Sequence, residues 1–158
     1  SVSSKVSPVI DLQRTSVSTI HNRVDNNNAI DVVAETNARG GSSLAKHLTV
    51  PITLAEKAKG LKIMLGANKP SAASFDVYFR TNSTGGRLLD QAFTLIAPEV
   101  NIPSDDNPEV FRDYSYLPGG IGGTLNDFDQ FQIKIVMKST NSSKVSRFGD
   151  LRVIALTV

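Results

Sequence analysis

The sequence contains no cysteine, no tryptophan, only two histidines and no long hydrophobic run. Without cysteine, the chain can form neither a disulfide framework nor a thiolate metal site. No apolar run approaches the roughly 20 residues that a membrane-spanning helix requires, so we expect no membrane insertion. The first residues, SVSSKVSPVI, include neither an initiator methionine nor the charged and apolar regions of a signal peptide. We therefore expect a fragment of a longer protein.

Charged residues are nearly balanced in sign and scattered along the chain. There are 17 lysines and arginines against 15 aspartates and glutamates, which gives a formal net charge of +2 and a pI of about 9.0. The densest basic stretch, Lys57, Lys59 and Lys62, lacks the interleaved aromatic residues of a nucleic-acid surface. We expect no nucleic-acid partner. With 158 residues, of which 40% are hydrophobic, the chain can form one packed domain.

Residues 1–43 differ from the remainder in their frequent structure breakers. The asparagine run 26–28 and the glycine pair 40–41 separate short apolar stretches at 6–12 and 29–34. This pattern predicts an extended lead-in arm with short strands over 1–43, followed by the folded domain over 44–158.

Alternation of hydrophobic and polar residues becomes regular from residue 44 and is typical of strands with one buried face. The first run aligns four apolar side chains: Leu48, Val50, Ile52 and Leu54. Pro51 lacks a backbone donor, which predicts an edge strand or a bulge at that point. The same alternation over 61–65 and 75–79 predicts two further strands, whereas residues 55–59 are interpreted as a single helical turn.

Residues 131–158 read FQIKIVMKSTNSSKVSRFGDLRVIALTV, which is two strand patterns joined by a polar connection. They predict a closing hairpin, and the apolar content of 151–157 predicts a central position for the last strand. Strands are also expected over 93–96 and 110–116. With about eight or nine short strands and no long amphipathic helix, we predict an all-β fold, an antiparallel β-sandwich of jelly-roll-like type.

Three segments carry a resemblance to a known family: SPVIDL at 7–12, HLTVPITLAEKAKGLKIMLGANKPSAASFDVYFRT at 47–81, and FQIKIVMKSTNSSKV with DLRVIAL near the end. They resemble a module of virion structural proteins in contractile-tailed bacteriophages, especially marine ones. The resemblance implies a C-terminal module of a longer tail or baseplate-associated protein. It implies no catalytic residue.

Metal-binding residue types are few. His21 and His47 have no Asp, Glu or Cys at a ligand spacing, so we expect no zinc site and no cofactor. The loop SDDNPE offers Asp105, Asp106 and Glu109 as oxygen ligands for calcium, but without the spacing of an EF-hand. We favour a solvated Asx-type turn over a calcium site.

Catalytic patterns are also missing from the sequence. No serine stands in a Gly-x-Ser-x-Gly elbow, and the two histidines are too few to favour a Ser–His–Asp triad. Asp127 and Asp129 flank Phe128 in the manner of paired glycosidase carboxylates, but such pairs are common in β-proteins. We expect no enzyme activity.

The most prominent polar set outside the expected core consists of tyrosines and arginines. Alternation places Tyr78 and Arg80 on one face of their strand, and Arg112, Tyr114 and Tyr116 on one face of another. Exposed Tyr and Arg are enriched at interfaces and can stack on sugars, so these five residues are candidates for an interface or glycan site. The competing interpretation is that the tyrosines pack at the rim of the sandwich.

Our leading hypothesis is a non-enzymatic virion module that mediates protein–protein assembly in the tail or baseplate. It would act through surface complementarity with other virion proteins, within a homo-oligomer, after assembly in the host bacterial cytoplasm. The alternative is a carbohydrate-binding jelly-roll domain that recognises a glycan on the host surface. A hydrolase is a third, weaker hypothesis, because it requires acid and base residues converging from separate loops.

Overall fold

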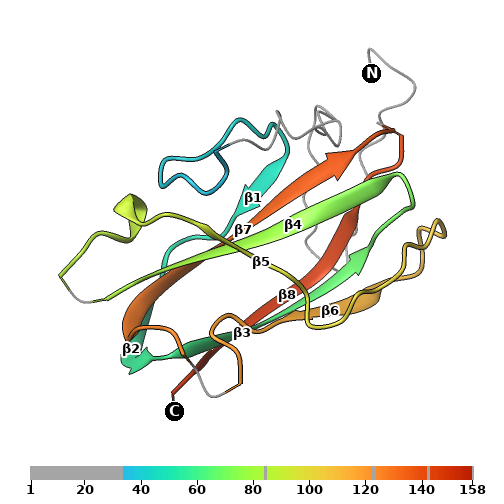
Figure 1. Ribbon diagram of the computed structural model, residues 1–158. Helices are drawn as coiled ribbons and strands as arrows, with labels where there is room; N and C mark the ends of the chain where they lie inside the picture. Colours follow the sequence, from blue (N-terminus) through green and yellow to red (C-terminus); the bar gives the residue numbers. More distant parts are fainter. Residues whose placement is uncertain (1–33, 84, 122–123, 142, 158) are drawn as a thin grey trace.

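The structure is a computed structural model that describes residues 34–83, 85–121, 124–141 and 143–157. The described part folds into two antiparallel sheets that face each other (Figure 1). The strands and the single short 3-10 helix, η1, have these bounds: β1 Lys46–Leu48, β2 Ile52–Ala58, β3 Gly60–Asn68, β4 Ala73–Asn82, η1 Leu88–Asp90, β5 Thr94–Ile96, β6 Arg112–Tyr116, β7 Phe128–Ser139 and β8 Arg147–Leu156. The predicted all-β antiparallel sandwich is confirmed.

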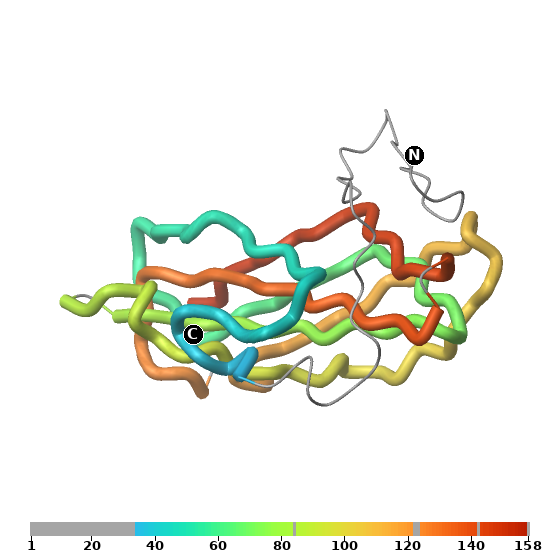
Figure 2. The backbone as a smooth tube through the Cα atoms, turned by 90° about the horizontal axis from the view of Figure 1, so that it is seen from above, coloured from blue at the N-terminus to red at the C-terminus, as the bar shows by residue number. Residues whose placement is uncertain are grey.

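The strands are distributed so that the chain crosses repeatedly between the sheets. The larger sheet has the order β1-β7-β4-β5, with β2 also paired to β7, and the smaller sheet has the order β6-β3-β8. Among the described strands, only β4 and β5 are both consecutive in sequence and paired. The other strand pairs join segments that are distant in sequence. Seen from above, the long strands of both sheets lie roughly along one common axis (Figure 2).

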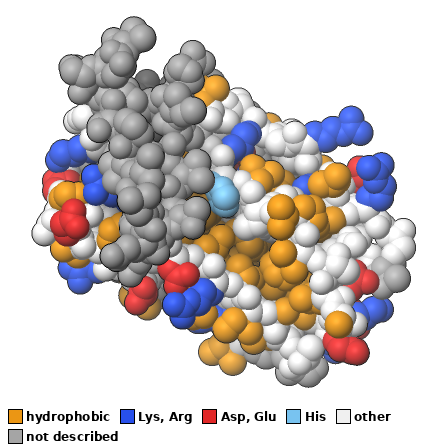
Figure 3. Space-filling model, turned by 180° about the vertical axis from the view of Figure 1, so that it is seen from behind, with side chains coloured by type: hydrophobic (Ala, Val, Ile, Leu, Met, Phe, Trp, Pro, Cys, Tyr) orange, Lys and Arg blue, Asp and Glu red, His pale blue; other side chains and the backbone are white. Residues whose placement is uncertain are grey.

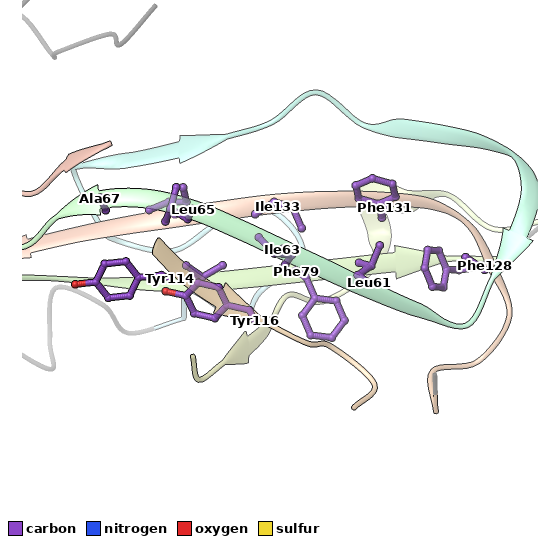
Figure 4. Close-up of a cluster of buried hydrophobic side chains, with 13 residues drawn as sticks. Leu61, Ile63, Leu65, Ala67, Phe79, Tyr114, Tyr116, Phe128, Phe131 and Ile133 are labelled. Carbon is purple, nitrogen blue, oxygen red and sulfur yellow. The ribbon is translucent and has the colours of Figure 1, made fainter. Parts of the chain in front are cut away.

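The main core lies between the two sheets. Alternate residues of β3 point inward and are completely buried or nearly so, including Leu61, Ile63 and Leu65, and they pack near Phe131 and Ile133 of β7 (Figure 4). Because side chains alternate along a strand, the period of two in the sequence is sufficient to create this apolar layer.

The strand that begins the domain is interrupted where Pro51 predicts a break. Both β1 and β2 pair with β7, at the edge of the larger sheet, and residues 49–51 lie between them. The predicted helical turn over 55–59 is wrong. These residues continue β2 as far as Ala58, with a register shift between Thr53 and Ala58, because pairing with β7 supplies their backbone partners.

The predicted closing hairpin is also wrong. β7 belongs to the larger sheet and β8 to the smaller one, so the polar connection between them crosses from one sheet to the other. β8 pairs only with β3 among the described residues and occupies an edge, not a central position. Its outward residues, Asp150 and Arg152, alternate with half-buried apolar ones, so only one face of β8 is covered.

Part of the predicted arm packs on the domain. Residues 34–43 form turns against the outer face of the larger sheet, where Glu35 is only 2% exposed. Residues 1–33 of the predicted arm lie outside the described residues. The segment 34–43 thus belongs to the packed structure and shields part of the outer face of the larger sheet from water.

Candidate functional site

A second, polar layer lies on the outer face of the larger sheet. The register between β4 and β7 places Tyr78 opposite Lys134 and Arg80 opposite Gln132. All four residues are buried, because the segment 34–45 and the segment around η1 cover them. We call Glu35, Tyr78, Arg80, Phe93, Gln132 and Lys134 the outer polar cluster.

Lys134 and Glu35 form the central ion pair of the outer polar cluster. Lys134 Nζ lies 2.8 Å from Glu35 Oε2, and the two side chains are 0% and 1% exposed. Lys134 Nζ also donates to the backbone oxygen of Glu35. Glu35 Oε1 accepts from the backbone N–H of Ser43 at 2.7 Å and lies 3.4 Å from Lys46 Nζ. One carboxylate therefore serves two ammonium groups.

The pKa values of this pair follow from burial and charge. Burial acts to raise the pKa of Glu35, but hydrogen bonds from Lys134 and the Ser43 N–H, with both lysine charges, lower it overall. Burial lowers the pKa of Lys134, and the charges of Lys46 and Arg80 act in the same direction, against the opposing effect of Glu35. The outer polar cluster thus contains one carboxylate, that of Glu35, and two cationic side chains, those of Arg80 and Lys134.

Arg80 is a buried guanidinium held by neutral partners. Its Nε donates to Gln132 Oε1 at 2.9 Å, and Nη1 donates to the backbone oxygens of Ala38, Leu89 and Gln91 at 3.0, 3.2 and 3.3 Å. The guanidinium carbon lies 4.4 Å from the centre of the Phe93 ring. Burial lowers the pKa of Arg80, and no carboxylate within the described residues hydrogen-bonds to it.

A hollow of about 530 Å³ opens beside the outer polar cluster. It lies between the segment 38–48, the segment around η1, and the sheet. Its walls combine basic and apolar side chains, and the lining residues are Ala38, Arg39, Gly40, Lys46, Leu48, Arg80, Arg87, Leu89, Asp90, Phe93 and Lys134. Its size is within the range of small-molecule sites.

Comparison with known proteins identifies no relative. No protein-family model, curated protein or solved structure matches this chain. The site must therefore be interpreted from its own geometry. Within the described residues, no helix is long and apolar enough to cross a membrane.

The predicted surface of tyrosines and arginines is wrong for four of its five residues. Tyr78, Arg80, Tyr114 and Tyr116 are only 5%, 4%, 3% and 2% exposed. Tyr114 and Tyr116 belong to the core between the sheets, and the other two lie in the outer polar cluster. Arg112 alone is exposed, and it pairs with Asp105 at 3.3 Å.

The three tyrosines lie almost completely below the described surface. Burial raises the pKa of Tyr78 to about 12 and also raises the pKa of Tyr116. The hydroxyl of Tyr114 has no hydrogen-bond partner in the described part of the chain. The alternation correctly placed Tyr78 with Arg80 on one face of β4, and Tyr114 with Tyr116 on one face of β6. It could not show that these faces are covered, because the covering segments are distant in sequence.

The acidic loop has the geometry of a turn. Asp105 Oδ1 accepts from the N–H of Asn107 at 3.0 Å, and Asn107 Oδ1 accepts from the N–H of Glu109 at 3.1 Å, so two Asx turns follow each other. Asp106 bonds instead to the Ser71 N–H and lies 3.1 Å from Lys144 Nζ. No group of three ligating side chains converges anywhere in the described ranges. The Asx-turn interpretation is confirmed for this loop.

The remaining candidates do not form a site either. His21 lies outside the described residues, and His47 is exposed. Asp127 is exposed and lies 3.8 Å from Lys59 in a surface ion pair.

An apolar surface lies on the side of the molecule where β2 and β8 are the edges of their sheets. Val50 is 72% exposed, Ile52 37% and, from β8, Ile154 48%. Figure 3 shows hydrophobic side chains gathered over a continuous area of this face. The prediction that Leu48, Val50 and Ile52 share one buried face is wrong. Leu48 pairs with Lys134 and lines the hollow on the outer face, whereas Val50 and Ile52 lie at the sheet edge, where nothing described covers them.

Four residues of the outer polar cluster were not predicted from the sequence: Glu35, Phe93, Gln132 and Lys134. One signal was present: Gln132 and Lys134 alternate with the apolar residues 131, 133 and 135 in the middle of β7. A charged residue in the middle of a buried strand indicates a covered partner, which here is Glu35.

Proposed function

We propose that this chain is a non-enzymatic virion structural module that assembles with copies of itself and with neighbouring proteins in the tail or baseplate of a contractile-tailed phage. The assignment to a virion is supported by the sequence resemblance of residues 7–12, 47–81, 131–145 and 150–156. The assignment to assembly is supported by the exposed apolar side chains beside two strand edges that no described segment pairs with, and this observation carries the proposal.

The side of the molecule with the edges β2 and β8 has the features of a docking surface (Figures 2 and 3). An exposed strand edge can add a strand from another chain through main-chain hydrogen bonds, and apolar side chains beside it add buried area. Val50 and Ile52 supply that apolar area next to the edge of the larger sheet, and Ile154 supplies it next to the smaller one.

A second copy of this chain fits the charge pattern of β8. If β8 paired antiparallel with β8 of a second copy about a twofold axis at Leu151, Asp150 of each copy would face Arg152 of the other. Both side chains are accessible, at 48% and 71% exposure, and they already pair within one strand at 2.7 Å. The homodimer is therefore the occupant that the described surface favours.

Sedimentation velocity over a wide range of concentration tests the proposal. We expect reversible self-association of the chain that the substitutions Val50→Ser and Ile52→Ser together weaken, since they remove the apolar contact. The matched control is Val100→Ser, which changes a valine that is exposed to a similar degree, 66% against 72%, outside these edges. A chain that stays monomeric at every concentration would contradict the proposed self-assembly.

Carbohydrate recognition stays an alternative prediction. It relied on exposed tyrosines for stacking, and Tyr78, Tyr114 and Tyr116 are buried. The described geometry therefore favours assembly over glycan binding at those residues.

A further inference from the structure

The hollow beside the outer polar cluster carries an excess of positive charge. Its lining includes five cationic side chains: Arg39, Lys46, Arg80, Arg87 and Lys134. Among the described residues, two carboxylates, Asp90 and Glu35, lie in its lining or against it. With every group ionised, the excess is three positive charges.

The positive charges are poorly neutralised within the described residues. Lys46 and Lys134 share Glu35, and Arg80 hydrogen-bonds only to neutral groups. Arg87 reaches Asp90 at 4.0 Å, across an exposed surface, and Arg39 has no ion pair among the residues described. Because Arg80 and Lys134 are buried, solvent screens their charges weakly, and a concave surface concentrates the resulting field.

We infer that this hollow is a binding site for a phosphate monoester that carries a ring or another apolar substituent. A phosphate monoester bears close to two negative charges at neutral pH, and it matches the excess charge better than a monoanionic carboxylate does. Arg39 and Arg87 at the exposed rim would donate to the phosphate oxygens, the geometry for which guanidinium groups are suited.

The apolar substituent is assigned to the other part of the lining. Leu48 and Leu89, which are 42% and 49% exposed, present aliphatic surface to the hollow. Phe93 lies behind them under the cations of Arg80 and Lys134, at 4.4 and 4.2 Å from the ring centre. The ligand would bury these leucines while its phosphate lies toward the arginines.

This site and the proposed assembly surface depend on different residues. Assembly requires Val50, Ile52 and the β8 edge, whereas anion binding requires the rim arginines of the hollow. A failure of one proposal therefore leaves the other unaffected.

The test is a titration of the 158-residue chain with phenyl phosphate, followed by calorimetry and by amide chemical shifts. We expect saturable binding, with shifts in residues 38–40 and 87–93, and weaker binding of inorganic phosphate and benzoate. Benzyl alcohol, the uncharged comparison, should not bind. The double variant Arg39→Gln/Arg87→Gln should bind phenyl phosphate about tenfold more weakly or worse, because it loses the charged donors.

A second double variant, Lys57→Gln/Arg112→Gln, removes the same number of positive charges from exposed positions outside the hollow. It should keep the affinity of the unsubstituted chain. Equal losses in both double variants would show nonspecific attraction to a basic protein and would overturn the inference. It would equally be overturned by the absence of saturable binding, or by benzyl alcohol binding as tightly as phenyl phosphate.

Discussion

At the scale of single residues, Lys134 and Glu35 are the pair on which the covering of the larger sheet depends. Lys134 extends from the middle of β7, and Glu35 comes from a turn 99 residues earlier in the chain. Both side chains are withdrawn from water, so each charge requires the other. Gly41 allows the close approach of this turn, because a Cβ at position 41 would lie 2.7 Å from Glu35 Cα.

Removing one member of this pair should be more costly than removing both. Lys134→Met or Glu35→Gln alone leaves a buried charge without its main partner, and we expect a loss of about 3 to 5 kcal/mol in the free energy of unfolding. The double variant should lose clearly less than the sum of the two, as measured by urea denaturation. Lys138→Met, which breaks a partly exposed pair with Asp76, should cost about 1 kcal/mol or less. Additive losses would contradict the predicted coupling.

The same pair predicts a pH dependence. Because the folded state lowers the pKa of Glu35 below its ordinary 4.5, the folded state binds fewer protons than the unfolded state in this range. The stabilisation by Glu35 is thus fully present above pH 4.5 and is lost as the pH falls through the lowered pKa. Thermal midpoints of the chain and of Glu35→Gln should differ most near neutral pH and converge in acid. A difference that does not change with pH would argue against an ionised Glu35.

At the scale of elements, β8 is the strand whose environment is least expected from its composition. It is rich in apolar residues, yet it occupies the edge of the smaller sheet. Asp150 and Arg152 alternate with the inward residues, and charges at an edge prevent unspecific pairing. They also make a single antiparallel register with a second copy favourable.

Charge reversal on β8 tests this register. Arg152→Asp should weaken self-association, because two carboxylates on each strand would then face two on the other. Asp150→Arg should weaken it similarly. The double variant, Asp150→Arg combined with Arg152→Asp, should restore association in sedimentation velocity, with thermal midpoints monitoring the fold. Full association of both single variants would exclude the proposed register.

At the scale of the whole molecule, the packed structure extends beyond the two sheets. Residues 34–45 and the segment around η1 form a cover over the larger sheet, with Tyr78, Val136 and Phe93 as a small second core. The packed domain therefore includes residues 34–43, which the sequence pattern assigned to the arm.

Two deletions separate the roles of these segments. Removal of residues 1–28 keeps Glu35 and the turn at residues 34–43, so it should leave the thermal midpoint nearly unchanged. Removal of residues 1–43 should lower the midpoint strongly, because Lys134 then loses Glu35. Equal midpoints for the two deletions would contradict a stabilising role for residues 34–43.

Much of the fold was predictable because its signal is local. The alternation in β3, β4 and β7 specifies strands with one apolar face, and Pro51 marks a break at an edge. The acidic loop was predictable as a turn for the same reason, since an Asx turn joins residues two positions apart. The outer polar cluster was not predictable in this way.

The sequence by itself determined the class of the fold, because hydrophobic alternation acts within each strand and requires no knowledge of its neighbours. Only the tertiary structure decided that β8 lies at an edge, that Tyr78 and Arg80 are covered, and that Val50 is exposed. These outcomes depend on which distant segments pack together. The ion pair of Glu35 and Lys134 and the basic hollow beside it arise only when the turn at residues 34–43 closes over the sheet.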